Sequence, residues 1–186
     1  MGREDYKDKD YFRKNSEEVK NGILNQLYDD ELNRFIKSVN PRNESLDASL
    51  FAIFYFNVLP AEDPRVINTM EEVERELWVK KGVGGIARYK GDLYFRTSEE
   101  IIGNPWILTT LYLSIFYSEI GNLKKAKSLI DWVTNFSFEL LPEQINPFSG
   151  EAVSVLPLAW SHAAFAVALS KFISKLKERN LSWKAL

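Results

Sequence analysis

Residues 104–121 read NPWILTTLYLSIFYSEIG, and residues 122–138 directly after them read NLKKAKSLIDWVTNFSF. The first stretch is apolar on nearly every side of a helix and stops at Gly121, so it predicts a helix that is buried all round. The second places its apolar residues on one side only, which predicts an amphipathic helix with a solvated face. Such a pair is typical of two concentric layers, in which an inner helix is covered on both sides and an outer helix stays wet on one.

The same alternation extends to both sides of this pair. Residues 46–59, LDASLFAIFYFNVL, predict another helix that is buried on most sides. Residues 63–79, DPRVINTMEEVERELWV, predict an amphipathic helix that is capped by Asp63 and has Pro64 at its first position. The last predicted helix covers residues 157–179 and becomes basic in its final turns, as the helix dipole favours.

Fewer signals mark the remaining segments. Residues 16–27 have apolar residues on one helical face and predict a first helix, whereas residues 28–40 predict a short extended excursion. The four glycines of residues 82–95, GVGGIARYKGDLYF, predict a loop or short hairpin. Residues 1–15 are expected to be disordered.

The chain is therefore expected to be all-α, with about six helices that alternate between inner and outer types. Its 186 residues, of which 45% are hydrophobic, can bury one sizeable core, so residues 1–186 are expected to form a single domain. Periodicity alone leaves a second architecture open, a compact all-α bundle around one central helix.

Composition excludes several classes of function. The formal net charge of −2 provides no positive field for a nucleic-acid backbone. The chain has no cysteine and one histidine, so neither a disulfide framework nor a zinc site is expected, and no cofactor is expected. The charged first ten residues do not form a signal peptide, and no apolar run reaches the length of a membrane span. We expect a soluble, cytoplasmic protein that contacts no membrane.

Four motifs in a fixed order carry more specific information. They are ESLDASLFAI at 44–53, GGIARYKGDLYF at 84–95, GNPWILTTLYL at 103–113 and LLPEQINPFSGEAVSVLPLAWSHAAFAVAL at 140–169. In this order and spacing they resemble the C-terminal half of the family 15 glycoside hydrolases, the glucoamylases and their bacterial and archaeal relatives. The resemblance covers about residues 46–172, and it implies the C-terminal half of an (α/α)6 barrel, in agreement with the alternation of inner and outer helices.

The resemblance also implies a chemistry, the hydrolysis of α-linked glucosides from the non-reducing end with inversion. That reaction uses two carboxyl groups roughly 6.5–9.5 Å apart, one as general acid and one as the base that activates a water. Glu143 in LLPEQ falls where the family has its general base. By spacing alone a loop glutamate is more often one more surface acid, and the surrounding motifs are what favour the catalytic role.

The other candidate residues bind the sugar by the same resemblance. Arg88 matches the family's arginine for the hydroxyls of the terminal glucose, and its planar fork of donors suits vicinal hydroxyls. Asp92 is expected to fix Arg88 or to contact the sugar, and Tyr89 to line the pocket or the core. Gln144 is expected to orient Glu143 or to reach the sugar. Trp106 and Trp160 each open an apolar helix, where the indole could stack on a glucose ring or belong to the core.

Two further residues are expected to be structural. Asp47 is interpreted as a cap or a buried hydrogen-bond acceptor. His162 has no Ser and Asp partners in the arrangement of a hydrolase triad, so we interpret it as a satisfied histidine in the core or at the edge of the pocket.

The family's general acid lies in the N-terminal half of the barrel, which no segment before Leu46 resembles. The chain is therefore interpreted as a fragment, a split-gene product or a truncated relative, and it is expected to be inactive alone. Its apolar helices would expose faces that a missing half should cover, so the expected partners are an α-glucoside substrate and either a separate N-terminal half or a second copy of the chain. The alternative is a non-catalytic helical module that binds a protein partner or carbohydrate.

Overall fold

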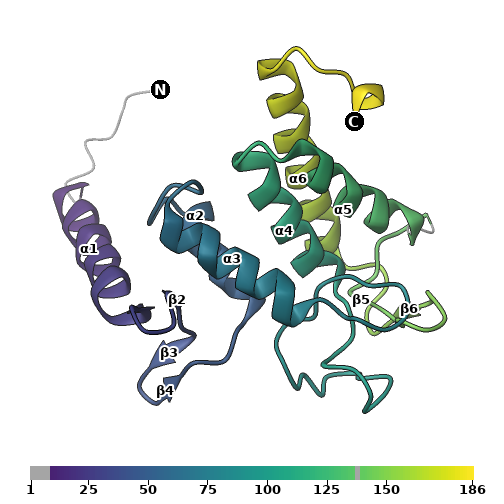
Figure 1. The fold of residues 1–186 in the computed structure, drawn as a ribbon, viewed down its shortest axis with the longest axis horizontal. Coiled ribbons are helices and arrows are strands. Elements are labelled where there is room, and N and C mark those ends of the chain that lie inside the picture. The colour runs from purple at the N-terminus through teal and green to yellow at the C-terminus, as the bar shows by residue number, and fades with distance from the viewer. Residues whose placement is uncertain (1–8, 137–138) are drawn as a thin grey trace.

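A computed structural model of the chain describes residues 9–136 and 139–186. The helices are α1 (Lys9–Gly22), α2 (Ala52–Tyr55), α3 (Pro64–Leu77), α4 (Ile107–Glu119), α5 (Leu123–Asn135) and α6 (Ala159–Glu178). Short two-residue strands form three antiparallel pairs, β1 (Tyr28–Asp29) with β2 (Arg34–Phe35), β3 (Ser38–Val39) with β4 (Arg42–Asn43), and β5 (Gln144–Ile145) with β6 (Ala152–Val153). A π-helical turn, Ile23–Leu27, follows α1, and 3-10 turns occupy Ala48–Phe51 and Trp183–Ala185. The described part of the chain is thus built mainly from helices (Figure 1).

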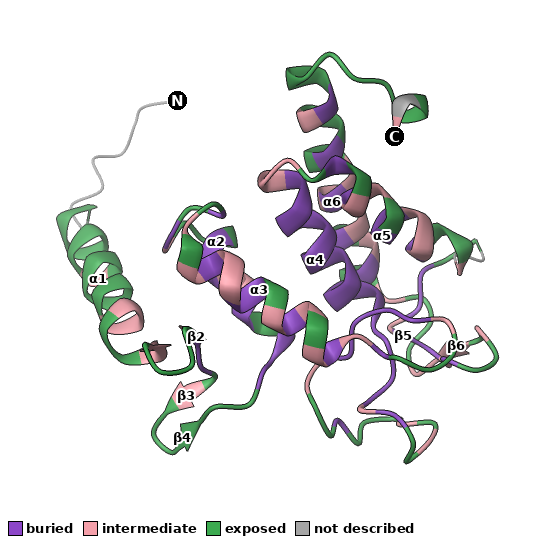
Figure 2. Cartoon of the chain, viewed as in Figure 1, coloured by how far each residue is buried: buried purple, intermediate pink, exposed green. Residues whose placement is uncertain are grey.

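Helix α4 is the centre of the fold, as its apolar sequence predicts. Residues 107–118 are all buried, and α5 and α6 pack against it (Figures 1 and 2). The Ser114 hydroxyl donates to the Ala126 carbonyl of α5 at 3.0 Å, so even a polar residue of α4 is satisfied inside the core. The turn into α5 passes through Gly121 at φ +77°, the left-handed conformation expected just after a helix end.

The amphipathic helices predicted over residues 63–79 and 122–138 form as α3 and α5, whereas within the helix predicted over residues 16–27 the α-helix ends at Gly22 and a π-helical turn follows. The Asp63 carboxylate accepts the Arg65 N–H at 2.9 Å and Pro64 is the first residue of α3, while Met70 and Leu77 lie on its buried face. Helix α5 likewise buries one face. Residues 137 and 138, which close the predicted α5 segment, lie outside the described residues.

The helix predicted over residues 46–59 is wrong in its length. A 3-10 turn and the single turn of α2 are all that forms, and Asn57 ends them at φ +58°. The N–H groups of Val58 and Leu59 both donate to the Ile53 carbonyl, which closes the helix end. Burial is confirmed for part of this segment, since Leu50, Ile53 and Phe54 are buried, whereas Tyr55 is 37% and Phe56 70% exposed.

Helix α6 is buried on one face only. Its buried residues recur along a single stripe that includes Ala164, Ala168 and Phe172, whereas Trp160 and Ile173 are exposed (Figure 2). A helix of the inner layer is covered on both sides. Because α6 is buried on one face only, its other side is uncovered in this chain.

Helix α1 lies apart from α4, α5 and α6 (Figure 1), whereas Phe35 of the first hairpin is buried against α3. Helix α1 has no buried residue, and the two β-hairpins after it form the extended excursion predicted there. Residues 9–15, part of the segment expected to be disordered, form the first turns of α1, and residues 1–8 lie outside the described residues. Among the described residues, no helix combines the length and the apolar character needed to cross a membrane. The cytoplasmic location stays a prediction.

Candidate active site

The glycine-containing loop between α3 and α4 is held against the core from several sides. Ile86 pairs with Trp78, and Ala87 pairs with Pro105 just before α4. Gly85 adopts φ +91°, and a Cβ there would lie 2.5 Å from the Trp132 ring, so only glycine allows this close approach. The backbone is therefore fixed immediately before Arg88, which follows Ala87.

Arg88 is fixed by a nearly buried carboxylate. Its Nε donates to one Asp92 oxygen at 3.0 Å and its Nη2 to the other at 2.8 Å, while Asp92 itself is 1% exposed. Burial lowers the pKa of the Arg88 guanidinium, but the hydrogen bonds and the charge of Asp92 outweigh burial, so the pKa lies above its ordinary value. Arg88 stays cationic, and among the described residues its Nη1 has no hydrogen-bond partner.

Aromatic side chains surround this guanidinium. Its central carbon lies 4.6 Å from the Trp106 ring centroid, 4.8 Å from that of Tyr89 and 5.5 Å from that of Tyr94. The Tyr89 hydroxyl is also 3.3 Å from Nη2. A cation with aromatic walls and a free N–H edge can bind a polar ring that stacks and accepts hydrogen bonds.

Glu143 lies in the loop between α5 and α6, at the start of the β5–β6 pair. Its carbonyl accepts the Ile107 N–H at 3.1 Å, and its own N–H donates to the Val155 carbonyl at 2.9 Å. The Ser154 hydroxyl donates to Glu143 Oε2 across the hairpin. The backbone of Glu143 is therefore fixed on both sides, its carboxylate is oriented by Ser154, and the half-buried side chain is still reached by solvent.

Residues in the first turn of α6 hold the Glu143 loop by hydrogen bonds. The Ser161 hydroxyl donates to the Pro142 carbonyl at 2.8 Å, and the Leu141 N–H donates to His162 Nε2 at 3.1 Å. His162 Nδ1 lies 2.8 Å from the Leu158 carbonyl, which assigns its proton to Nδ1. The interpretation of His162 as a satisfied structural residue is confirmed.

Gln144 connects the Glu143 loop to the Arg88 cluster. It is fully buried, it pairs through its backbone with Trp106, and its Oε1 accepts from Asn104 Nδ2 at 2.9 Å. Gln144 Nε2 and Trp106 Nε1 are buried donors without a hydrogen-bond partner among the described residues. Gln144 is therefore held in place by its carbonyl oxygen and by its backbone.

The structure brings six of the seven predicted site residues together. Arg88, Tyr89, Asp92, Trp106, Glu143 and Gln144 are joined by the contacts described above. Trp160 lies apart from them on α6, in a pocket lined mostly by apolar side chains of α2, α4 and α6, and its sugar-stacking role stays a prediction.

Three residues that the sequence did not single out belong to the site. Tyr94 contacts both Arg88 and Trp106, Asn104 holds Gln144, and Ser154 holds Glu143. Asn104 stands in the GNPW motif and could have been marked by it, whereas no local pattern marks Ser154.

Asp47, expected to be a cap or acceptor, accepts the Ser49 N–H at 2.9 Å and pairs with Lys37 Nζ at 2.8 Å. No cluster of three or more His, Cys, Asp or Glu suited to a metal ion occurs among the described residues.

Comparison with known proteins bears on the family of the chain. The sequence model of glycosyl hydrolases family 15 matches residues 2–136, a range that ends before Glu143. An uncharacterized glycosyl hydrolase of Methanocaldococcus jannaschii is 38% identical over 169 residues, which cover 83% of this chain and 26% of the relative. A trehalase of Mycobacterium tuberculosis is 30% identical over 171 residues, 90% of this chain and 24% of that enzyme.

Solved structures confirm the predicted fold class. A bacterial glucoamylase complexed with acarbose superimposes with a TM-score of 0.77 at 21% identity, over 92% of this chain and 30% of the glucoamylase. The fold is thus part of the glucoamylase (α/α)6 barrel rather than a separate compact bundle. The chain spans about a quarter of the length of the curated relatives it matches.

Proposed function

Because the chain belongs to glycosyl hydrolases family 15, we propose that it carries the general base and part of the glucose-binding pocket of an inverting, exo-acting α-glucoside hydrolase. The observation that carries this proposal is the Glu143 carboxylate, which is half-buried and oriented by Ser154, and whose backbone is joined to the cluster of Arg88, Trp106 and Gln144 through Ile107 and Gln144.

In this mechanism Glu143 removes a proton from a water that attacks the anomeric carbon on the face opposite the leaving oxygen. A base must be held to about half an ångström, and the contacts on Pro142, Glu143 and Leu141 provide such support. The leaving oxygen needs a protonated carboxyl roughly 6.5–9.5 Å away. We propose that a separate part of the barrel supplies this acid, so that the chain alone does not turn over substrate.

Arg88 is the proposed principal ligand of the terminal glucose. Asp92 accepts hydrogen bonds from Nε and Nη2 of the guanidinium and leaves Nη1 to bind the sugar. The orientation of the guanidinium is therefore set before the substrate binds. The Trp106 ring lies 4.6 Å from the central carbon of the Arg88 guanidinium, and the buried Gln144 pairs with Trp106 through its backbone. Tyr89 and Tyr94 complete the aromatic wall.

Complementation tests the proposal. The chain is mixed with the part of the Methanocaldococcus jannaschii relative that precedes the segment matched here, and glucose release is measured from an α-glucan and from trehalose, since trehalases are among the relatives. The mixture should release glucose from at least one of the two, and Glu143→Gln should lower kcat about 10²–10⁴-fold, the usual contribution of a general base.

The matched control is Glu151→Gln, because Glu151 is an exposed acid of the same loop that contacts Ser149. Its activity should equal that of the unsubstituted mixture. Unchanged activity in Glu143→Gln would remove Glu143 from the mechanism. A folded mixture that releases no glucose from either substrate would favour the non-catalytic helical module.

A further inference from the structure

Two side chains of α6 hold the backbone just before Glu143. The Leu141 N–H donates to His162 Nε2 at 3.1 Å, and the Pro142 carbonyl accepts the Ser161 hydroxyl at 2.8 Å. Leu141, Pro142 and Ser161 are buried, whereas His162 is half-buried and can exchange protons with solvent. Of the two side chains, only the imidazole changes from acceptor to donor with pH.

The contacts of His162 require a neutral imidazole. Nδ1 lies 2.8 Å from the Leu158 carbonyl, which can only accept, so Nδ1 carries the ring proton and Nε2 offers a lone pair to the Leu141 N–H. A proton taken up from solvent would bind to this lone pair. Two N–H groups would then face each other across the present separation of 3.1 Å, so the hydrogen bond to Leu141 is lost.

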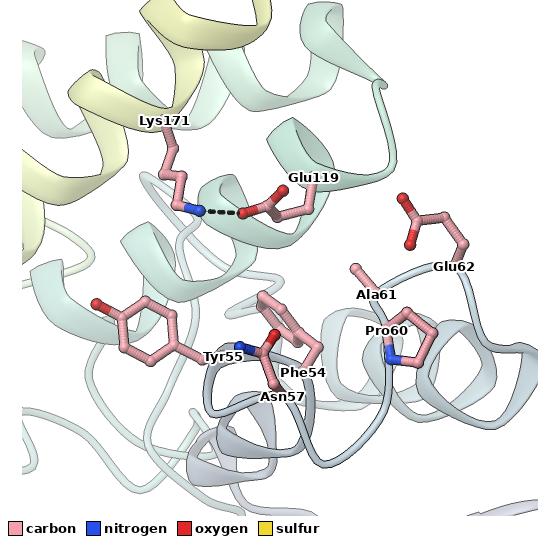
Figure 3. A pocket seen from close by; sticks show the side chains of 8 residues that line it. All are labelled: Phe54, Tyr55, Asn57, Pro60, Ala61, Glu62, Glu119 and Lys171. Atoms are coloured by element: carbon pink, nitrogen blue, oxygen red, sulfur yellow. Dashed lines mark hydrogen bonds and ion pairs between the residues drawn. The ribbon is translucent and has the colours of Figure 1, made fainter.

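No charged neighbour compensates such a proton. The elements packed against α6 carry these ionisable groups: Glu139, Glu143 and Glu151 in the loop, Tyr55 on α2, Tyr112, Tyr117 and Glu119 on α4, and Lys124, Lys125, Lys127 and Asp131 on α5. No hydrogen bond or ion pair joins any of them to His162 among the described residues. The next charge on α6 is Lys171, about 13 Å further along the helix, and Figure 3 shows it paired with Glu119.

We propose that His162 is a positioning residue for Glu143. The neutral imidazole holds the start of the loop, and protonation of Nε2 releases the Leu141 N–H and lets the carboxylate two residues later move. This role rests on the proposed function, because it concerns the placement of the general base. A displacement of about 1 Å can cost a reaction up to 10²-fold in rate, so release of the loop should lower kcat.

Exchange of the Leu141 amide proton tests the release without any catalysis. The chain has a single histidine, so NMR of the labelled full chain reads the tautomer and the protonation of one imidazole in the same samples. Histidine takes up its proton between about pH 8 and pH 5. Over this range the protection factor of Leu141, which is corrected for the intrinsic effect of pH on exchange, should fall about 10-fold as the imidazole is protonated.

Three variants separate the contact from general effects of pH. His162→Gln offers an amide oxygen that takes up no proton in this range, so Leu141 should stay protected at both ends of it. His162→Phe removes the acceptor and should lower the protection at both. The control is Lys171→Gln, which removes a polar contact at the other end of α6 (Figure 3) and should follow the unsubstituted chain.

The complemented protein gives a second measurement. On going from about pH 8 to pH 5, kcat should fall about 10-fold less in His162→Gln than in the unsubstituted chain, with similar KM values. Losses from other ionisable groups are common to both proteins and cancel in this comparison.

Four results would each overturn the proposal. They are constant Leu141 protection over the pH range, an imidazole proton on Nε2 at about pH 8, equal loss of protection in His162→Gln and the unsubstituted chain, and equal loss of kcat in these two proteins. Expected exchange results without any glucose release would overturn the proposed function, while the pH-dependent release of the loop would stand.

Discussion

At the scale of single residues, the Asp92 carboxylate depends on Arg88. Asp92 is 1% exposed and accepts two hydrogen bonds from Arg88 and one from the Tyr94 N–H. Arg88→Ala would leave a buried charge without its cation and should lower the free energy of unfolding by about 2–3 kcal/mol, less than for a fully buried pair because Arg88 is partly solvated. Arg88→Lys keeps the charge and should cost less. Urea unfolding at pH 7 measures both, and equal midpoints for Arg88→Ala and the unsubstituted chain would contradict the dependence.

Asp47 gives the stability an acid-sensitive component. Burial raises the pKa of Asp47, but the hydrogen bonds from Lys37 and from Ser49 more than offset burial, and the folded pKa lies below the ordinary value of 3.8. The ionised carboxylate therefore contributes stability that is present above about pH 3.8 and is lost as the pH falls through the folded pKa. Asp47→Asn should lower the free energy of unfolding at pH 7 and flatten its decline below pH 4.

Unfolding curves between pH 7 and pH 3 test this prediction. Asp30 is an exposed acid of the neighbouring hairpin without a hydrogen bond or ion pair among the described residues, so Asp30→Asn serves as the control. Its pH dependence should follow that of the unsubstituted chain. If Asp47→Asn also follows it, Asp47 carries no pH-linked stability.

Ser154 is predicted to position the proposed base. Its hydroxyl donates to Glu143 Oε2, and without it the carboxylate keeps its backbone contacts but loses its rotational restraint. Ser154→Ala should lower kcat of the complemented protein about 10-fold with little change in KM, because a displaced base affects the chemical step. Ser149→Ala removes a hydroxyl that contacts Glu151 in the same loop and should leave kcat unchanged. A loss of the same size in both variants would indicate general damage to the loop.

At the scale of elements, the spacing of apolar residues together with the capping residues predicted α3, α4 and α5. Asp63, Pro64 and Gly121 act through local backbone geometry, which the sequence shows directly. The same reasoning failed at residues 46–59. There a left-handed Asn57 ends the helix, and asparagine carries a weaker stop signal than glycine or proline.

The candidate site shows the same division. Glu143 and Arg88 were predicted as site residues from the resemblance of their motifs to a family. The spacing of apolar residues alone does not indicate which residues meet at a site. Ser154 reaches Glu143 from eleven positions along the chain, across a hairpin of two-residue strands that no alternation pattern marks. A side chain whose only signal is its position after folding cannot be predicted from local sequence.

A polar contact joins three helices at the side of the core. The Tyr117 hydroxyl of α4 donates to Glu74 Oε2 of α3 at 2.5 Å, and Lys125 Nζ of α5 lies 2.5 Å from the same oxygen. Tyr117→Phe removes the hydroxyl and should lower the free energy of unfolding by about 1–2 kcal/mol, as expected for a hydrogen bond to a charged group. Tyr112→Phe is the control on the same helix, because no hydrogen bond engages the Tyr112 hydroxyl among the described residues. Thermal unfolding of both variants should separate them, and an equal effect would remove the contact from the stability of the helix packing.

At the scale of the whole molecule, the chain combines a well-packed centre with an uncovered side. Helix α4 is buried over residues 107–118, whereas α6 is covered on one face and α1 has no buried residue. The relatives extend well beyond the matched region, to about four times its length in the curated sequences. The separate part of the barrel proposed above would therefore act as a partner that stabilises the folded chain by covering the exposed side of α6.

This coupling predicts a melting temperature that depends on the concentration of the partner. A ligand that binds only the folded state at 100 times its Kd adds about 2.7 kcal/mol of stability. For a chain of this size that corresponds to a rise in Tm of about 5–10 °C. Phe56→Glu should have the Tm of the unsubstituted chain when alone, because Phe56 is exposed, and should lose most of the rise when the partner is added. Differential scanning calorimetry over a titration of the partner measures both quantities. A Tm that rises equally in Phe56→Glu would place the stabilising contact away from Phe56. A Tm that never rises would mean that the partner does not stabilise the folded chain.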